Sequence, residues 1–214
     1  MKIICLQNGT KIVMKFSKSA QLSSELLVID GLWGCGKSVV MQLLSVFDSM
    51  ESCTIDYLYD YIPNFSQSQS MTRDAAVCLI RSKFDDLTYQ KCISRSVNFR
   101  YKDQTSIFKH PKKYQYLLRL LQNGGDQSLN KINANKMIIP ILTHISSSNN
   151  DLFHMALGER CKIINCIRHP IFILDWWADY LKKMFLSPRD FVLKIRHKDI
   201  DIPFFAYGWE DEYL

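Results

Sequence analysis

A glycine-rich turn at residues 31–38 carries the residue types that bind phosphate. The stretch LLVIDGLWGCGKS is an apolar run that leads directly into a turn with the spacing Gly-x-x-x-x-Gly-Lys-Ser. Glycines permit backbone conformations that aim several N–H groups into a turn, where a Cβ would hinder them. A lysine at this place reaches terminal phosphates, and the serine hydroxyl bonds phosphate or Mg²⁺. The spacing predicts a phosphate-binding loop formed by Gly31, Trp33, Gly34, Cys35, Gly36, Lys37 and Ser38.

The segments on either side of this loop fit the same chemistry. Residues 25–30 have the composition of a buried strand, and residues 39–47 have the spacing of an amphipathic helix. A helix N-terminus adds unpaired N–H groups and partial positive charge beside a bound phosphate. The alternative interpretation is a glycine-rich turn between a strand and a helix that binds no ligand.

Two later positions carry side chains suited to group transfer. An apolar run at 137–142 is followed by Thr143 and His144, and a second run ends just before Arg168. Histidine titrates near neutral pH and can act as a general base, whereas arginine binds a phosphate dianion through its planar fork. The alternatives are a histidine that caps the next turn and an arginine in a surface ion pair.

Apolar strands that alternate with amphipathic helices predict an α/β fold. Such a pattern requires right-handed crossovers and gives a mostly parallel central sheet in a three-layer α/β/α arrangement. Ligands of these sheets bind beyond the carboxyl ends of the strands, so the loop, His144 and Arg168 are expected at one edge. The strands are expected at 25–30, 53–57, 137–142 and 161–167, and helices at 39–47, 72–94, 110–122, 126–134, 151–157 and 170–185.

Other segments predict smaller features. Short β-prone runs on either side of Asn8-Gly9 indicate a hairpin, so we divide the chain into an N-terminal hairpin and linker (1–24) and a P-loop domain (25–214). Residues 61–70 have the composition of an irregular loop. A proline in SPRD (187–190) is typical of a helix start, so a further helix is expected there.

The composition narrows the classes of partner and location. The 214 residues carry a formal net charge of +6 without a dense Lys/Arg tract, which does not indicate nucleic-acid binding. Seven scattered cysteines with no CxxC pair indicate free thiols in a reducing compartment, and no metal site. No apolar stretch reaches the ~20 residues of a membrane span, and no signal peptide is recognisable. We therefore expect a cytoplasmic protein; its oligomeric state is left open.

The order strand, Thr-His, short helix, strand, Arg-x-Pro resembles the middle of the sulfotransferases that use 3′-phosphoadenosine-5′-phosphosulfate (PAPS), a family within the P-loop nucleoside triphosphate hydrolase superfamily. With the phosphate loop, the resemblance covers roughly residues 25–185. It implies sulfuryl transfer to a hydroxyl or amine of a small molecule or glycan. His144 would be the general base, Lys37 would stabilise the transferred group, and Arg168 would bind the 3′-phosphate of the donor.

Several positions depart from that family. Leu142 stands where the family has a lysine, and Trp176 where it commonly has a serine that binds phosphate. The loop reads Cys-Gly-Lys-Ser in place of Ser-Gly-Thr-Thr, and the chain ends at GWEDEYL with no glycine-rich basic loop to close over the adenosine. A truncated copy, or a nucleotide-binding protein without catalysis, is therefore an alternative.

An ATP- and Mg²⁺-dependent kinase of small molecules or nucleosides is the other alternative, because the loop resembles that of nucleoside and shikimate-type kinases. Such an enzyme needs a carboxylate for Mg²⁺. The candidate strand 161–167 ends in Arg168, and we expect no strand to end in a clear aspartate of that type, which favours sulfuryl transfer.

The polar segment 95–109 is expected to overhang the sheet edge and to bind an anionic or hydroxyl-rich acceptor such as a sugar, or, in a kinase, to form a basic lid. A solvated loop is the alternative interpretation. The acceptor-binding candidates are Asp56, Arg95, Asn98, Arg100 and Lys102.

Overall fold

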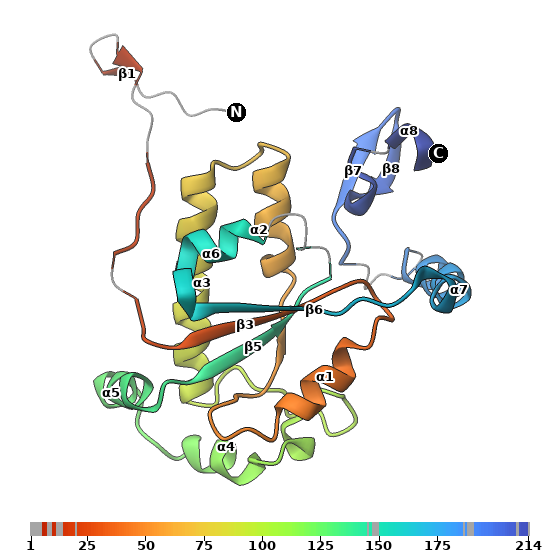
Figure 1. Ribbon diagram of the computed structural model, residues 1–214. Helices are drawn as coiled ribbons and strands as arrows, with labels where there is room; N and C mark the ends of the chain where they lie inside the picture. The colour runs from red at the N-terminus through yellow and green to blue at the C-terminus, as the bar shows by residue number, and fades with distance from the viewer. Residues whose placement is uncertain are drawn as a thin grey trace.

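Four parallel strands form the central sheet (Figure 1). The computed structural model describes residues 6–7, 10–11, 15–19, 21–144, 146, 150–185, 187, 191–208 and 210–213. Within it the strand order is β4-β5-β3-β6, and Val28 lies opposite Ile141 on one side and Ile163 on the other. This confirms the predicted mostly parallel α/β sheet. The strands are β3 (Glu25–Asp30), β4 (Thr54–Ile55), β5 (Ile138–Leu142) and β6 (Cys161–Asn165).

Helices cover both faces of the sheet because side chains of each strand alternate between the faces. Leu26 and Val28 of β3 join the larger core, with residues of α2 (Leu58–Gln67), α3 (Arg73–Cys92) and α6 (Asp151–Leu157). Leu27 and Ile29 join the smaller core on the other face, with Met41 of α1 (Lys37–Leu44). The predicted three layers are thus present.

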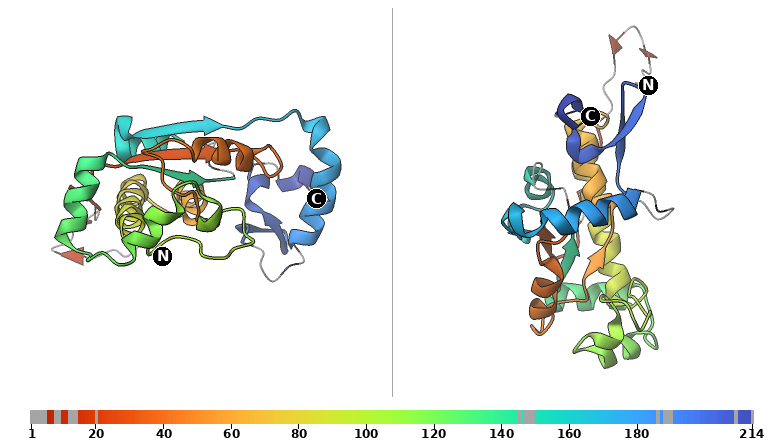
Figure 2. Two further views of the ribbon diagram at one scale, coloured as in Figure 1. Left: turned by 90° about the horizontal axis from the view of Figure 1, so that it is seen from below. Right: turned by 90° about the vertical axis from the view of Figure 1, so that its right-hand side faces the viewer.

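Two further helices lie towards the amino ends of the strands. They are α4 (Lys113–Arg119) and α5 (Asp126–Asn135), while α7 (Leu174–Phe185) lies at the opposite end of the sheet from α5 (Figure 2). These helices fall inside the ranges expected from the sequence or within a few residues of them. The position of α7 matters for function because the carboxyl ends of the strands point towards it (Figure 1).

The prediction of an irregular loop at 61–70 is wrong, because most of that segment belongs to α2. A proline inside a helix removes one backbone hydrogen bond and costs about 3 kcal/mol. Here Tyr59, Ile62 and Pro63 are all buried, and the Tyr59 ring lies 6.4 Å from that of Phe153 in α6. Burial of this apolar face in the larger core outweighs the local cost of the proline.

The prediction of a further helix that starts at SPRD (187–190) is also wrong. Residues 188–190 lie outside the described part, and the chain beyond them forms an antiparallel hairpin of β7 (Lys194–His197) and β8 (Ile200–Pro203), followed by the short α8 (Glu210–Tyr213). Lys198 and Asp199 both have positive φ, as a two-residue type I′ turn requires. The hairpin forms because this turn aligns Ile195 with the buried Ile202.

The N-terminal hairpin is present as β1 (Leu6–Gln7) and β2 (Thr10–Lys11), which pair antiparallel; the turn residues 8 and 9 lie outside the described part. The linker that follows the hairpin forms hydrogen bonds with α3. Phe16 N donates to Asp74 Oδ2 at 2.8 Å, and Leu22 N donates to Asp85 Oδ1 at 3.1 Å. The division of the chain at residue 24 stays a prediction.

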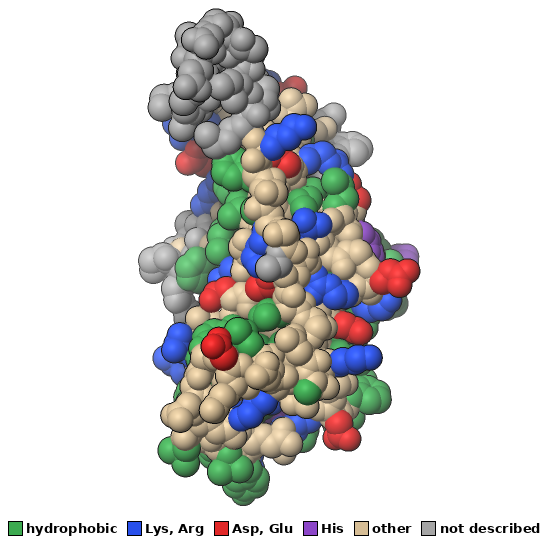
Figure 3. All heavy atoms as spheres, turned by 90° about the vertical axis from the view of Figure 1, so that its left-hand side faces the viewer, with side chains coloured by type: hydrophobic (Ala, Val, Ile, Leu, Met, Phe, Trp, Pro, Cys, Tyr) green, Lys and Arg blue, Asp and Glu red, His purple; other side chains and the backbone are tan. Residues whose placement is uncertain are grey.

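The described residues contain free cysteines and a surface on which charges of both signs are mixed. The six cysteines among them are free, and Cys5 lies outside this part of the chain. On the coloured part of the face drawn in Figure 3, Lys and Arg side chains are interspersed with Asp and Glu. None of the described helices combines the length and the apolar character needed to cross a membrane.

The α3 helix offers a direct test of the larger core. Ile80 is fully buried, whereas its neighbour Leu79 is 44% exposed. We expect Ile80→Ala to lower the free energy of unfolding by about 2–5 kcal/mol, since it removes buried methyl groups and leaves a cavity. Leu79→Ala is the matched control and should cost less than about 1 kcal/mol. Equal losses for the two variants in urea denaturation would contradict this packing.

Candidate functional site

Residues 31–36, the turn predicted to bind phosphate, join β3 to α1 (Figure 1). Gly31 has a φ of 141°, and a Cβ there would lie 2.4 Å from the Cys166 carbonyl oxygen. Gly36 has a φ of 96° at the N-cap of α1, with open space around it. Gly31 is thus required because the backbone that follows β6 lies too close to leave room for a Cβ. Gly36 is required because of its positive φ alone.

Lys37 begins α1 and is buried inside the turn, with 7% of its surface exposed. Its Nζ donates to the carbonyl oxygens of Gly31 and, at 3.2 Å, Leu32. Burial lowers the pKa of Lys37 below its usual value, while the Cys35 thiol, Asp30 and Asp60 oppose this effect. A cation in such a desolvated position interacts more strongly with an anion than a cation in water does.

A cavity of about 230 Å³ lies beside the turn, at the carboxyl ends of the strands. Arg168 reaches this cavity from β6, and its Nη1 donates to the Gly34 carbonyl oxygen at 3.2 Å. Of the loop residues predicted to bind phosphate, Gly31 and Cys35 belong to the described lining, whereas Trp33, Gly34, Gly36, Lys37 and Ser38 do not. The structure thus brings three separate predicted segments to one cavity, whose lining includes Asp30, Gly31, Cys35, His144 and Arg168.

His144 is held between two aromatic rings and a carboxylate. Its ring stacks on Trp33, with centroids 4.9 Å apart, and on Tyr57, with centroids 5.7 Å apart. Its backbone N donates to Asp60 Oδ1 at 2.8 Å, and its Nδ1 lies 3.3 Å from Asp60 Oδ2. An ionised carboxylate only accepts hydrogen bonds, so contact with Asp60 favours a ring that carries a hydrogen on Nδ1. These contacts fix the orientation of the His144 ring.

Two carboxylates of the site were missed by the sequence analysis. Asp60 lies in α2, between the strand expected at 53–57 and the irregular loop expected at 61–70. Asp30 is the fully buried last residue of β3; its Oδ1 accepts from Thr143 Oγ1 at 2.6 Å, and its Oδ2 has no hydrogen-bond partner among the described residues. Strand β3 thus ends in an aspartate, while the expectation that no strand ends in a clear Mg²⁺-binding aspartate stays a prediction. The signal in the sequence that could have pointed to Asp30 was its place as a single charged residue at the end of the apolar run LLVID.

Helix α7 covers the outer side of the phosphate loop. A Cβ on Gly34 would lie 2.9 Å from the Trp176 ring, and Trp177 Nε1 donates to the Trp33 carbonyl oxygen at 2.8 Å. Trp176 stands where the resembled family commonly has a serine. In this chain that position packs on the loop and offers no hydroxyl group to a phosphate.

The acceptor-binding candidates lie apart from this cavity. None of Asp56, Arg95, Asn98, Arg100 and Lys102 is among the described residues that line it. Asp56 pairs with Lys83 Nζ at 3.0 Å, and its Oδ1 accepts from Leu58 N at the start of α2. Asn98 binds Asp103 and Thr105 of its own segment, at 3.1 and 2.9 Å. These two side chains therefore stabilise local backbone structure, beside β4 and not beside the phosphate loop.

The chain matches no protein-family model, no curated protein and no solved structure. No group of three or more His, Cys, Asp or Glu side chains placed to hold a metal ion occurs in the described ranges. The function is therefore argued from the geometry of this cavity.

The contact between Asp60 and His144 can be tested through the tautomer of the imidazole ring. We expect Asp60→Asn to raise the population of the Nε2–H tautomer, because an amide can donate to Nδ1 where the carboxylate could only accept. Two-bond ¹H–¹⁵N spectra of the histidine rings report this population. Asp56→Asn is the matched control, since Asp56 pairs with Lys83, and should leave the His144 signals unchanged. An unchanged tautomer in Asp60→Asn would contradict the positioning role.

Proposed function

We propose that the protein is a PAPS-dependent sulfotransferase that acts on a hydroxyl or amine of a small molecule or glycan. The observation that supports it is the meeting of His144, Arg168 and the glycine turn at one cavity. The two residues are separated by a helix and a strand in the sequence, and each belongs to a motif of the resembled family. A turn without a ligand would not require a carboxylate-positioned histidine beside it.

Donor binding would use Arg168, which lines the cavity, and groups of the adjoining turn and of α1. The N–H groups of the turn and of the first turn of α1, together with Lys37, would hold the 5′ end of the donor. Arg168 would bind the 3′-phosphate through its guanidinium fork. In the structure its Nη1 donates to the Gly34 carbonyl oxygen, so the guanidinium already lies against the loop.

Sulfuryl transfer would proceed by in-line attack. His144 Nε2 would take the proton of the acceptor hydroxyl as its oxygen forms a bond to sulfur, and the bond from sulfur to the phosphate oxygen of the donor would break. Adenosine 3′,5′-bisphosphate would leave with the electron pair of that bond. Asp60 would stabilise the imidazolium, and Lys37 would stabilise charge on the bridging oxygen.

Calorimetry with adenosine 3′,5′-bisphosphate tests this proposal. We expect wild-type protein to bind it, and Arg168→Ala to weaken binding by about tenfold or more because a charge-assisted pair is lost. His144→Ala should leave this affinity within about twofold and lower the transfer rate by about 10²–10⁴.

Arg100→Ala is the matched control, because Arg100 is highly exposed and does not line the cavity. Its affinity and rate should equal those of wild type. Loss of nucleotide binding in His144→Ala would mean that the histidine is structural. Failure of wild-type protein to bind either this nucleotide or ATP would favour a protein without catalysis.

A kinase is the second candidate, and one observation favours it. The unpartnered Oδ2 of Asp30 belongs to a residue that lines the cavity. Carboxylate oxygen is a preferred ligand of Mg²⁺, and the Ser38 hydroxyl at the start of α1 would complete the protein contribution, with phosphate oxygens of ATP as the remaining ligands. The acceptor would then be a hydroxyl group phosphorylated by ATP.

The two candidates differ in their need for Mg²⁺. If the protein is a kinase, ATP should bind more tightly with Mg²⁺ than without it, and Asp30→Asn should abolish that difference while Arg168→Ala should not. If it is a sulfotransferase, the bisphosphate should bind equally with Mg²⁺ or with a chelator. The same calorimetric titrations, repeated in both buffers, distinguish these outcomes.

A further inference from the structure

A second cavity lies beside the edge strand of the sheet. Strand β4 pairs with β5 on one side only, and none of the described strands pairs with its other side. Residues 96–98 and Thr105 lie along that side, and a cavity of about 280 Å³ remains between them and β4. It shares no lining residue with the cavity at the phosphate loop, and the side chains that matter here are Thr54, Lys91, Ser96, Asn98 and Thr105.

Lys91 gives this cavity its chemical character. The side chain comes from the last turn of α3 and is only 1% exposed. Within the described part of the chain, the one hydrogen-bond acceptor of its Nζ is the neutral Ser52 Oγ, at 2.8 Å. Burial lowers the pKa of Lys91 to about 8, so the ammonium form still predominates at neutral pH. A buried ammonium group thus remains with most of its donor capacity unused.

The charged groups near Lys91 do not neutralise its positive charge. Both carboxylate oxygens of Glu51 accept from Arg119, at 2.8 and 2.9 Å, in a bidentate pair. Burial raises the pKa of the Cys53 thiol to about 12, so this group is neutral. The cluster therefore contains two cations and one carboxylate. A buried positive charge without a counter-ion is costly, and an anion in the adjacent cavity would offset it.

Among the described residues, the lining of this cavity offers hydrogen-bond donors and no carboxylate. Thr54 Oγ1 is buried and has no hydrogen-bond partner among the described residues. The hydroxyl groups of Ser96 and Thr105 belong to the lining as well. As an edge strand, β4 also leaves backbone groups on this side without a strand partner. A cavity that combines hydrogen-bond donors with one buried cation is suited to binding an oxyanion.

We propose that the cavity beside β4 is a second anion-binding site, which takes a small oxyanion such as a phosphate or carboxylate group. Lys91 is its counter-ion, and the Thr54 hydroxyl is a donor to it. The site is independent of the proposed transfer reaction, because it lies along a different strand and uses none of the residues at the phosphate loop.

Titration with inorganic phosphate and with acetate tests the proposal. Phosphate can also bind at the phosphate loop, so the measurements use Lys37→Ala as the background. In that background we expect one remaining site for phosphate, acetate or both. Addition of Lys91→Met should weaken it about tenfold or more, which corresponds to loss of a charge-assisted hydrogen bond. A preference for one of the two ions identifies the ligand as phosphate-bearing or carboxylate-bearing.

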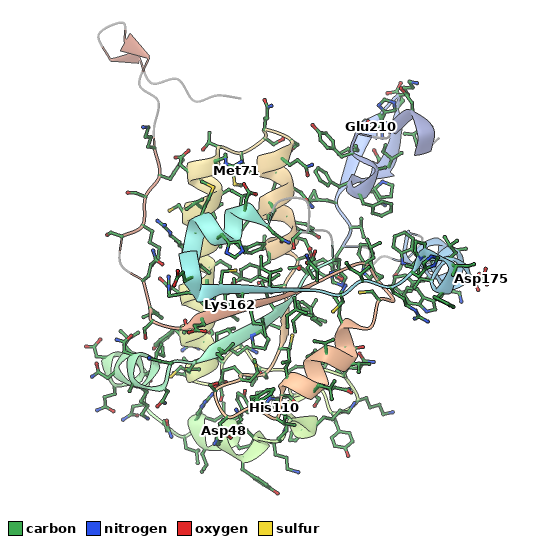
Figure 4. All side chains as sticks on the ribbon, in the orientation of Figure 1. Asp48, Met71, His110, Lys162, Asp175 and Glu210 are labelled. Atoms are coloured by element: carbon green, nitrogen blue, oxygen red, sulfur yellow. The ribbon has the colours of Figure 1, made fainter. Side chains whose placement is uncertain are left out.

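Two further variants make the result decisive. Thr54→Val removes a hydroxyl at nearly constant volume and should weaken binding about threefold or more, even if Lys91→Met fails to fold. Lys162→Met removes an exposed lysine of β6 (Figure 4) and should leave the affinity within about twofold. The proposal is overturned if the Lys37→Ala protein binds neither ion, or if Lys91→Met and Thr54→Val both bind as tightly as that background.

Discussion

The parallel pairing of β3 with β5 on one side and β6 on the other is the constraint on which the candidate site depends. Parallel strands end at the same edge of a sheet, so the residues that follow each strand must meet there. Backbone hydrogen bonds continue this pairing past the strand ends: Thr143 N donates to Ile29 O at 3.1 Å, and Cys166 N donates to Asp30 O at 2.8 Å. The phosphate loop, His144 and Arg168 are fixed relative to one another by main-chain contacts.

The site itself is organised by buried carboxylates. Asp30 holds the end of β5 through Thr143, and Asp60 holds His144 through both the backbone and the ring. Each of these aspartates is almost fully buried, where an unpaired charge is costly. Lys37 lies close enough for both to raise its pKa against the effect of burial. The Lys37 ammonium group and the carboxylates of Asp30 and Asp60 therefore interact electrostatically.

The two candidate reactions would use different residues of this site. Sulfuryl transfer would rely on Arg168 and on Nε2 of His144, whereas phosphoryl transfer would rely on Asp30 Oδ2, which has no hydrogen-bond partner among the described residues. The aromatic packing of Trp33 and Tyr57 on His144 would serve either chemistry, because it fixes the orientation of the ring. Trp176 and Trp177 extend this packing to the loop, and they link the position of α7 to the conformation of the turn.

Local signals in the sequence determined the strands, most helices and the glycine turn between β3 and α1. Apolar runs and glycine spacing are short-range properties, and parallel pairing then required the loop, His144 and Arg168 to lie at one edge. The sequence analysis failed where distant contacts decide the outcome. Burial of Tyr59 and Ile62 against α3 and α6 makes α2 a helix despite Pro63, and contacts across the fold turn Asp60 and Asp30 into parts of the site. The separation of residues 95–102 from the phosphate loop was likewise decided by tertiary structure, because only the packing of that segment along β4 determines which end of the sheet it reaches.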